Sequence, residues 1–430
     1  MKKSIKLGLV GYGTVGQGVA KILRKNKSYI EHKIGASVEI AGVCDLRKPR
    51  LDSGYCCADY KQLIADPEID IIVELIGGYE PARSLILEAL NAGKNVITAN
   101  KAVLAKYWDE IFKTASKNQR LVYFEASVGG GIPVVQALNE GLAANQIQKI
   151  SGILNGTTNY ILTEMTKQKI DFKSALAKAQ KAGFAEANPT FDIEGIDTAH
   201  KLAILCSLAW SRWVKLDDIS ISGISKVTAE DINFAKDEFG YVMKLLGSAK
   251  LSKQGLEVSV EPCLISGSHP FANVEQEYNA VLIRGDAVGD VMFYGKGAGQ
   301  LPAASAVVSD IIDLAKQVAV DTAGKLPYVK YGFSKRIKIV PQEQSYGCFY
   351  LRFSAIDKPG VLSTVSGILS RCGVSIASVY QKEPLSGSRR GASIVMLTHR
   401  IKYGGLLRAL RQIDALPVIK SKTVKFRIKD

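Results

Sequence analysis

Short apolar segments alternate with amphipathic segments along the first third of the chain. The pattern predicts strands over 5–10, 38–44, 69–75, 94–98 and 120–125, and helices over 15–24 and 81–92. Because strands that alternate with helices are covered on both faces, this order indicates a parallel sheet with helices on each side. We therefore expect an α/β domain with an open parallel sheet over residues 1–135.

The pattern becomes mostly helical after Pro133. It predicts helices over 133–143, 157–168, 172–182, 195–210 and 228–249, and strands over 147–154 and 257–266 that are antiparallel or lie at an exposed edge. This mixture indicates an α+β domain over 136–322, whose sheet packs one face against helices. Its last helix, 302–321, carries an apolar stripe, and we expect it to pack back on the first domain.

The end of the chain has a third pattern. Residues 323–346 include a basic stretch with Pro and Gly, which predicts a linker. The segment 347–430 then predicts strands over 348–356, 374–382, 391–399 and 417–427, and helices over 360–371 and 404–412. This βαββαβ order is that of a ferredoxin-like domain.

The composition is that of a globular protein, with 47% hydrophobic and 23% charged residues in 430. No segment approaches the roughly 18 consecutive apolar residues of a membrane span, so we expect no membrane partner. Seven cysteines without a CxxC spacing argue against a disulfide framework and a zinc site. These observations favour the reducing cytoplasm.

The formal net charge of +15 makes nucleic acid a candidate partner. The lysines and arginines, however, are spread over the whole chain, and no arginine-rich tract or aromatic-interleaved motif gathers them. We therefore favour a basic surface that attracts anionic small molecules, and we expect no nucleic-acid partner.

A glycine-rich turn follows the first predicted strand and precedes the first helix. Its sequence, Gly11-Tyr12-Gly13-Thr14-Val15-Gly16, fits the pattern G-x-G-x-x-G. The first glycine permits a tight turn, the second lets the backbone approach a pyrophosphate, and the third lets helix and strand pack closely. The helix N-terminus then faces negative charge. We expect a Rossmann-type dinucleotide site here, although a turn without a ligand is the alternative.

The second predicted strand ends at Asp45, which can hold a ribose 2′-hydroxyl and so favours NAD. Arg47, Lys48 and Arg50 follow at once and can neutralise a 2′-phosphate instead. A solvated basic loop is the plain alternative. On balance these residues favour NADP, with NAD also accepted.

Two lysines stand where chemistry is expected. Lys101 follows the fourth strand, at the edge of the sheet where open α/β folds bind ligands, although it could equally be a surface lysine at a helix start. Asp197 and Lys201 are four residues apart and share a helix face, which is also the spacing of an ordinary surface ion pair. The density of acids over 183–201 favours a site that grips an ammonium group and delivers a proton. His200 receives no role.

Two glycine-containing segments offer backbone groups to ligands. Asn155-Gly156-Thr157-Thr158-Asn159 lies between a strand and a helix, and suits either a plain helix cap or a cradle for a carboxylate. Gly129-Gly130-Gly131, near Glu125, offers carbonyl oxygens to a hard monovalent cation.

Together, these motifs resemble the homoserine dehydrogenase family, in its long bacterial form with a C-terminal ACT domain. The matching motifs are GLVGYGTVGQGV (8–19), VITANKAVLA (96–105), FEASVGGGIPVV (124–135), GILNGTTNYIL (152–162), the stretch 183–204 and YGKGAGQLPAASAVVSD (294–310). They cover nearly the whole chain in the family's order. The resemblance implies the reversible, NAD(P)H-dependent reduction of L-aspartate 4-semialdehyde to L-homoserine.

The resemblance also assigns roles to residues. It makes Lys101 and Lys201 catalytic, and it favours Lys201 as the donor of a proton to the carbonyl oxygen. It implies the following substrate-binding residues: Gly156, Thr157, Glu186, Asp192 and Asp197. For the cofactor it implies Gly11, Gly13, Thr14, Val15, Gly16, Asp45, Arg47, Arg50, Lys101, Gly297 and Gly299. For a structural sodium or other monovalent cation it implies Glu125 with the carbonyls of Val128, Gly130 and Ile132.

The segment Asp357-Lys358-Pro359-Gly360-Val361-Leu362 resembles the ligand-binding loop of ACT domains. Such domains pair across subunits and bind amino acids where they pair. The resemblance therefore implies a homodimer or homotetramer and feedback by an amino acid, with threonine the expected effector at Asp357 and Gly360. A domain that only dimerises is the alternative.

Two other classes of function compete with this interpretation. A non-catalytic amino-acid sensor would bind ligands without turnover, but it has no need of two lysines and a cluster of acids. An RNA-binding protein would display aromatic side chains on its terminal sheet, where Tyr350, Phe353 and Tyr380 are candidates, but the RNP pattern is absent.

Overall fold

The computed structural model describes the chain except for residues 1, 48, 52–53, 330–336, 383–391 and 430. The described chain forms two compact units. The first comprises residues 1–156, 197–219 and 278–337, and the second comprises 157–196, 220–277 and 338–430. Among the described residues, no helix combines the length and the apolar composition that a membrane span requires.

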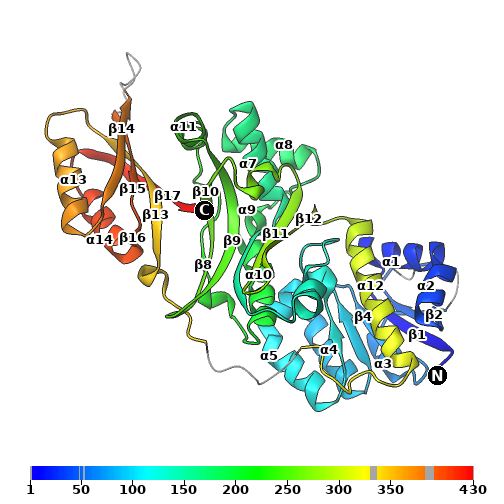
Figure 1. Cartoon of the computed structure of the whole chain (residues 1–430). Coiled ribbons are helices and arrows are strands. Elements are labelled where there is room, and N and C mark those ends of the chain that lie inside the picture. Colours follow the sequence, from blue (N-terminus) through cyan, green and yellow to red (C-terminus); the bar gives the residue numbers. More distant parts are fainter. Residues whose placement is uncertain (1, 48, 52–53, 330–336, 383–391, 430) are drawn as a thin grey trace. The chain divides into compact units, whose positions relative to one another are not determined.

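The first unit contains a parallel six-stranded sheet in the order β3-β2-β1-β4-β5-β6 (Figure 1). Its strands are β1 (Ser4–Val10), β2 (Ser37–Cys44), β3 (Tyr55–Cys57), β4 (Ile71–Glu74), β5 (Asn95–Thr98) and β6 (Val122–Tyr123). The predicted α/β sheet is confirmed. Since all six strands run the same way, the chain leaves β1, β2, β4 and β5 at one edge.

Helices cover this sheet. The helices of this unit are α1 (Thr14–Lys25), α2 (Lys27–Ile34), α3 (Tyr60–Ala65), α4 (Ala82–Asn91), α5 (Lys101–Lys117), α6 (Val134–Gln136), α10 (Ile196–Ala209) and α12 (Gln300–Ala319). Of these, α2, α3, α4 and α12 contact strands of the sheet directly. Helix α12 packs on α1 (Figure 1), and its residues Val307, Ile311 and Leu314 share a buried core with Leu7 and Leu9 of β1. The predicted helix over 133–143 is shorter than expected, because after α6 the backbone widens into a π-helical turn over Ala137–Gly141.

A second, antiparallel group of strands also belongs to the first unit. Strand β11 (Tyr278–Gly285) lies between β7 (Ile147–Ile153) and β12 (Gly289–Lys296). The sequence pattern predicted β7 but neither β11 nor β12. The β11–β12 hairpin leads through Gly297–Gly299 into α12, and so connects this sheet to the helix beside α1.

The second unit contains α7 (Gly156–Gln168), α8 (Phe172–Lys181), α9 (Thr190–Ile193), α11 (Ala229–Phe239) and the strands β8 (Ser220–Ile221), β9 (Tyr241–Ser252) and β10 (Gly255–Ser266). The predicted helix over 228–249 is confirmed over Ala229–Phe239 and is wrong beyond Gly240. Gly240 adopts the left-handed conformation at φ +66° and ends α11, and the following apolar run forms β9. Strand β10 is not an edge strand, because β9 pairs with one side of it and β8 and β17 (Ile419–Lys429) with the other.

The terminal domain has the predicted βαββαβ order. Its elements are β13 (Tyr346–Ala355), α13 (Val361–Arg371), β14 (Ile376–Lys382), β15 (Ala392–Thr398), the two-residue β16 (Ile401–Lys402), α14 (Tyr403–Ile413) and β17. Strands β17, β13, β15 and β14 form an antiparallel sheet in that order. The helices pack on one face of this sheet, in a core that includes Phe353, Val365 and Leu406.

Helix α11 covers the other face of the terminal sheet. Asp231 is fully buried and accepts two hydrogen bonds from Arg352, at 2.5 and 2.9 Å, and one from the Tyr350 hydroxyl at 3.2 Å. Phe234 and Phe239 of α11 pack against Tyr380. Tyr350 is therefore buried beneath α11, and Phe353 is buried on the other face beneath α13 and α14, so this sheet presents neither as an open platform for RNA bases.

Candidate active site

The glycine turn sits between β1 and α1 as predicted. Gly11 adopts φ +99°, which favours glycine, and a Cβ on Gly16 would overlap the Gly11 carbonyl oxygen. Gly13 caps α1 without a side-chain hydrogen bond, and no acidic residue stands in the first turn. The first N–H groups of α1 are therefore free of side-chain caps and suit an anionic group such as a pyrophosphate.

Asp45, just after β2, is bound to this turn and to Arg47. One carboxylate oxygen accepts the Tyr12 N–H at 2.7 Å and Arg47 Nη2 at 2.9 Å. The other accepts the backbone N–H of Arg47 at 3.0 Å and its Nε at 2.9 Å. The hydrogen bonds from Arg47 hold the pKa of Asp45 well below its ordinary value, against the effect of burial. Arg50 is exposed, and Lys48 lies outside the described residues.

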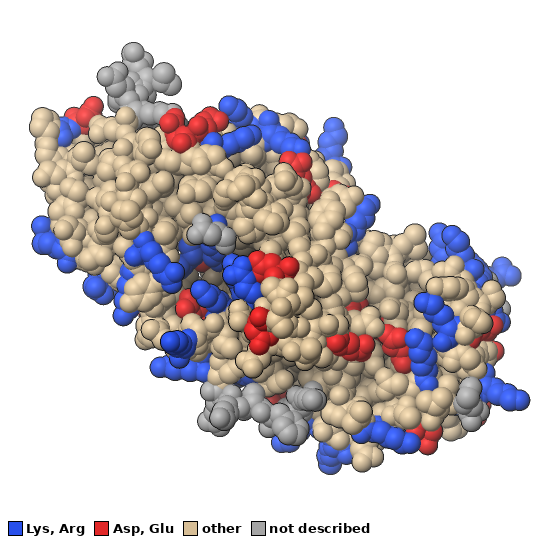
Figure 2. Space-filling model, in the orientation of Figure 1, with Lys and Arg blue, Asp and Glu red and all other residues tan. Residues whose placement is uncertain are grey.

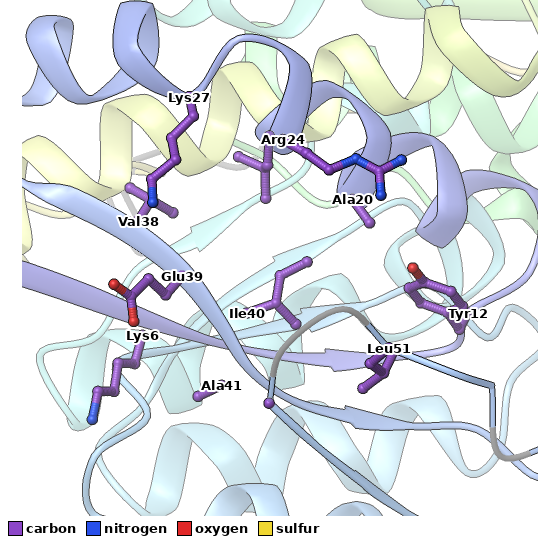
Figure 3. A pocket seen from close by; sticks show the side chains of 12 residues that line it. Lys6, Tyr12, Ala20, Arg24, Lys27, Val38, Glu39, Ile40, Ala41 and Leu51 are labelled. Carbon is purple, nitrogen blue, oxygen red and sulfur yellow. The ribbon is translucent and has the colours of Figure 1, made fainter.

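A pocket of about 580 Å³ lies beside the turn, along α1 and β2 (Figure 3). Tyr12 and Leu51 line one end, and Arg24 and Lys27 extend from the helical side. Its lining does not include the lysines and acids predicted for catalysis. The pocket is therefore adjacent to the predicted nucleotide turn and separate from the predicted reaction centre.

Lys101 is positioned by a polar cluster at the ends of β4 and β5. Buried Glu74 accepts the N–H groups of Ile76 and Gly77 and the hydroxyl of Thr98. Asn100 caps α5 through the Val103 N–H and donates to the Gly78 carbonyl at 2.7 Å. Lys101 is the first residue of α5, so the cluster fixes where its side chain begins.

The central feature is a carboxylate shared by two lysines. Asp197, near the start of α10, lies 2.7 Å from Lys201 Nζ through one oxygen and 3.3 Å from Lys101 Nζ through the other. Asn155 donates to Asp197 at 2.9 Å, and Lys201 also donates to the Leu154 carbonyl at 2.6 Å. The side chains of Asp197, Lys201 and Lys101 are 5, 11 and 36% exposed. The sequence predicted this set, and the structure brings it together.

Burial alone would raise the pKa of Asp197, but the charges of Lys201 and Lys101 and the hydrogen bond from Asn155 outweigh it and lower this pKa to about 2. Asp197 thus stays ionised at neutral pH. Its stabilising effect is present above the ordinary aspartate pKa and is lost only as the pH falls towards 2. Two cations share one anion, so the group carries one net positive charge. The hydrogen bonds of Lys201 to Asp197 and to the Leu154 carbonyl use two of the three N–H donors of its ammonium.

Other predicted substrate residues lie in the second unit. The Thr157 hydroxyl lies 2.6 Å from the Phe184 carbonyl oxygen and 3.1 Å from an Asp192 carboxylate oxygen, and its single proton can be donated to either, so the structure brings Thr157 and Asp192 together. Glu186 is exposed, and its carboxylate makes no hydrogen bond or ion pair with another described residue. Gly156 is the first residue of α7 and directly follows Asn155.

The predicted cation loop is tightly held. Gly129 and Gly130 adopt φ +76° and +58°. Glu125 uses its carboxylate to accept the N–H groups of Val135 and Gln136, at 2.9 and 2.7 Å, and its own N–H donates to buried Asp310. Burial raises the pKa of Glu125 to about 7. The side chain of Glu125 is thus a helix cap, and only backbone carbonyls of the loop remain to meet a cation.

These carbonyls fit a monovalent cation in part. Neutral oxygens suit such an ion. The nearby acids Glu125 and Asp310 do not supply a fixed negative charge, because burial raises the pKa of both. The Glu125 and Ile132 carbonyls already accept the Val128 and Val134 N–H groups, at 3.4 and 2.8 Å. No group of three His, Cys, Asp or Glu side chains among the described residues suits a metal ion.

Gly297 and Gly299 lie between this loop and α1. A Cβ on Gly130 would approach the Gly297 carbonyl carbon to 2.5 Å, and the Gly131 N–H donates to the Lys296 carbonyl. Gly299 caps α12 at φ +122° without a side-chain hydrogen bond. A Cβ on Gly18 would meet the Gln300 carbonyl at 3.0 Å, so the starts of α1 and α12 are neighbours. Two helix N-termini capped by glycine therefore lie near the predicted nucleotide site.

Comparison with known proteins agrees with this arrangement. Residues 11–125 match the family described as "Homoserine dehydrogenase, NAD binding domain", residues 133–312 match "Homoserine dehydrogenase", and residues 349–417 match "ACT domain". The chain is 42% identical to the homoserine dehydrogenase of Pseudomonas aeruginosa, over 99% of each chain, and 40% identical to that of Bacillus subtilis, over 99% of this chain and 98% of the other. This chain belongs to the homoserine dehydrogenase family.

Solved homoserine dehydrogenases have the same fold. The structure from Thiobacillus denitrificans superposes with a TM-score of 0.94 at 40% identity, covering 100% of this chain and 99% of the other. The structure from S. aureus at pH 7.5 has a TM-score of 0.78 at 32% identity and covers both chains completely. The chain is therefore an oxidoreductase with an NAD-binding domain and a C-terminal ACT domain.

The predicted effector residues lie on an exposed loop between β13 and α13. Asp357 is exposed, and Gly360 caps α13 at φ +87°. A Cβ on Gly360 would meet nothing within 4 Å, so the left-handed backbone and not crowding favours glycine there. The loop is thus open to solvent at the start of α13.

The sequence did not predict how several residues hold the centre together, although it placed Asn155 in a segment suited to a helix cap or a carboxylate cradle. Glu74 and Asn100 position the start of α5, while Asn155 and the Leu154 carbonyl fix Asp197 and Lys201. One signal was visible in the sequence, since Glu74 ends a buried apolar strand at the edge where ligands bind.

Proposed function

We propose that this chain catalyses the reversible reduction of L-aspartate 4-semialdehyde to L-homoserine, a step in the biosynthesis of threonine, methionine and isoleucine. The observation that carries the proposal is the buried array of Lys101, Asp197 and Lys201. A bound nicotinamide nucleotide would supply the hydride that reaches the aldehyde carbon. As negative charge develops on the carbonyl oxygen, the Lys201 ammonium donates a proton to it.

Asp197 orients Lys201 and, with the Leu154 carbonyl, occupies two of its donors. The remaining donor is available for the carbonyl oxygen. Lys101 adds a second positive charge, which stabilises the developing alkoxide. We also assign Lys101 to the residues that would contact the cofactor. For the ammonium end of the substrate we assign Glu186, Asp192 and Asp197, and for its carboxylate the N-terminus of α7 at Gly156 and Thr157.

The direct test is a steady-state assay of NADPH oxidation with L-aspartate 4-semialdehyde, and of the reverse reaction with L-homoserine. The proposal expects turnover in both directions. A sensor that binds amino acids and nucleotide without turnover is the second candidate, favoured only by the ACT domain. Binding of NADPH without turnover would select it.

For the cofactor, we infer NADP with NAD also accepted. Gly11, Gly13, Thr14, Val15 and Gly16 would hold the pyrophosphate, and Gly297 and Gly299 would close on it. The support for NADP is that Arg47 neutralises Asp45, which removes the repulsion between that carboxylate and a 2′-phosphate. Arg50 would add further positive charge.

Arg47→Ala should lower kcat/KM with NADPH by about ten- to hundred-fold, because a charge-assisted contact is lost and Asp45 is left as a bare anion. With NADH, which lacks the 2′-phosphate, kcat/KM should hold or rise. Lys21→Ala removes one positive charge from an exposed site on α1 and serves as the control. An equal loss with both nucleotides would exclude Arg47 as a reader of the 2′-phosphate.

We assign the carbonyls of Glu125, Val128, Gly130 and Ile132 to a structural cation, with sodium the expected ion. It would brace the loop that packs on Gly297. We further propose a cytoplasmic homodimer or homotetramer. No nucleic-acid partner is proposed, since Lys and Arg are scattered among acidic side chains on the face that Figure 2 shows.

We propose threonine as the effector, at Asp357 and Gly360. Asp357→Ala should raise the threonine concentration for half-maximal inhibition by about ten-fold, because the carboxylate would bind the effector's ammonium group. Inhibition is expressed for each variant relative to its own activity without threonine. Arg411→Ala, on the exposed side of α14, is the control. Identical inhibition curves for the Asp357 variant and the parent chain would contradict the assignment.

A further inference from the structure

Asn279 is a fully buried polar residue that no part of the proposed mechanism uses. It lies on β11 opposite Gly295 of β12, and its side chain is 0% exposed. Neither its Oδ1 nor its Nδ2 has a hydrogen-bond partner among the described residues. A buried carboxamide is normally paired, because leaving its donor or acceptor unmet costs free energy.

The carboxamide points at the loop that leads into α12. A Cβ on Gly297 would overlap the Asn279 side chain, so Asn279 occupies the space that any larger residue at 297 would need. Gly297 does not have a positive φ, and its backbone conformation alone does not require glycine. The presence of Asn279 is therefore the physical reason for glycine at this position.

The opposite side of the loop is anchored by the glycines of the cation loop. Gly130 comes within van der Waals contact of Gly297, and the Gly131 N–H binds the Lys296 carbonyl at 3.1 Å. Beyond this anchor, Ala298 and Gly299 are exposed. Among the described residues, no hydrogen bond holds the N–H groups of Gly297, Ala298 or Gly299. Unpaired peptide groups thus lie next to an unpaired carboxamide.

We propose that Asn279 is a positioning residue for the loop over 297–299. When a dinucleotide occupies the site, the carboxamide hydrogen-bonds the peptide groups of this loop and holds the loop against the ligand. The inference rests on the proposed dinucleotide site, beside which α12 begins. The carboxamide is unpaired without nucleotide and is hydrogen-bonded to the loop when nucleotide is bound. The free energy of these new hydrogen bonds therefore adds to the free energy of nucleotide binding.

The test measures nucleotide affinity and stability in the full chain. Asn279→Ala should raise the dissociation constant for NADPH, measured by titration calorimetry, by about ten-fold, the value of one to two hydrogen bonds. The KM for NADPH should rise more than kcat falls. Without nucleotide, the free energy of unfolding in urea should hold or increase, because unpaired polar atoms are removed. Asn279→Val, whose side chain fills more of the space than that of alanine, should show the same changes in NADPH affinity and in stability.

Asn145→Ala is the matched control, since Asn145 uses its carboxamide to bind Val288 N–H and the Leu142 carbonyl. It should lower the free energy of unfolding and leave NADPH affinity unchanged. If Asn279→Ala also lowers stability and leaves the affinity unchanged, Asn279 is only structural and the inference is overturned. If the parent chain binds neither NADPH nor NADH, the proposed function fails as well. The failure of the Asn279 inference alone is distinguishable, because the parent chain then still binds nucleotide.

Discussion

Lys201→Ala is expected to lower kcat for the reduction of L-aspartate 4-semialdehyde by about 10²–10⁴-fold, the contribution of a well-placed general acid. Lys201 is the lysine whose ammonium is held by both Asp197 and the Leu154 carbonyl, with one donor left for the substrate. The substitution removes the ammonium group that donates the proton and leaves the glycine turn unchanged. The dissociation constant for NADPH should therefore stay unchanged, and calorimetric titration measures it directly.

Lys167→Ala is the control for this loss. Lys167 is also a helical lysine, on α7, but its ion pair with Glu275 is exposed, so turnover should persist. Near-normal turnover of the Lys201 variant would remove Lys201 as the acid. A large loss in NADPH affinity would instead indicate a general disruption of the first unit.

Asp197→Asn should reduce both turnover and stability. The substitution leaves Lys201 and Lys101 close together without their shared anion, and breaking a buried ion pair in this way costs about 3–5 kcal/mol. We expect a loss of this order in the free energy of unfolding in urea at pH 7. Turnover should fall because Lys201 is no longer oriented by the carboxylate that holds it at 2.7 Å.

The double variant Asp197→Asn with Lys201→Met separates the two effects. Removing the orphaned ammonium should restore most of the lost stability, while turnover stays low because the proton donor is absent. If Asp197→Asn were as stable as the parent chain, the shared carboxylate would not be the element that holds the lysines together.

The sequence predicted the architecture well where periodicity and turn chemistry agree. The parallel sheet over 1–135 and the βαββαβ order of the terminal domain both follow from apolar strands separated by amphipathic helices. The helix expected over 228–249 forms only over Ala229–Phe239, and the second half of the prediction failed for a local reason. The run after Gly240 is apolar enough for a buried helix or a strand, and pairing with β10 along its whole length decides for the strand.

The candidate site, like the fold, was predicted only in part. Lys101, Asp197 and Lys201 could be found because the motifs around them are specific and because Asp197 and Lys201 have helical spacing. Glu74, Asn155 and Asn279 could not, since their importance depends on contacts with residues distant in sequence. Asn279 is an example: its neighbour Gly297 is brought to it only by the β11–β12 hairpin, which the pattern did not predict.

We propose that this chain transfers hydride to an amino-acid semialdehyde. Deuterium transfer tests this step directly: NADPH with deuterium at both hydrogen positions of the nicotinamide C4 is mixed with L-aspartate 4-semialdehyde, and the product is analysed by mass spectrometry. We expect L-homoserine carrying one deuterium on C4, formed in proportion to the NADPH consumed. If both ligands bind and no labelled homoserine forms at saturating NADPH and semialdehyde, the proposed hydride transfer is contradicted.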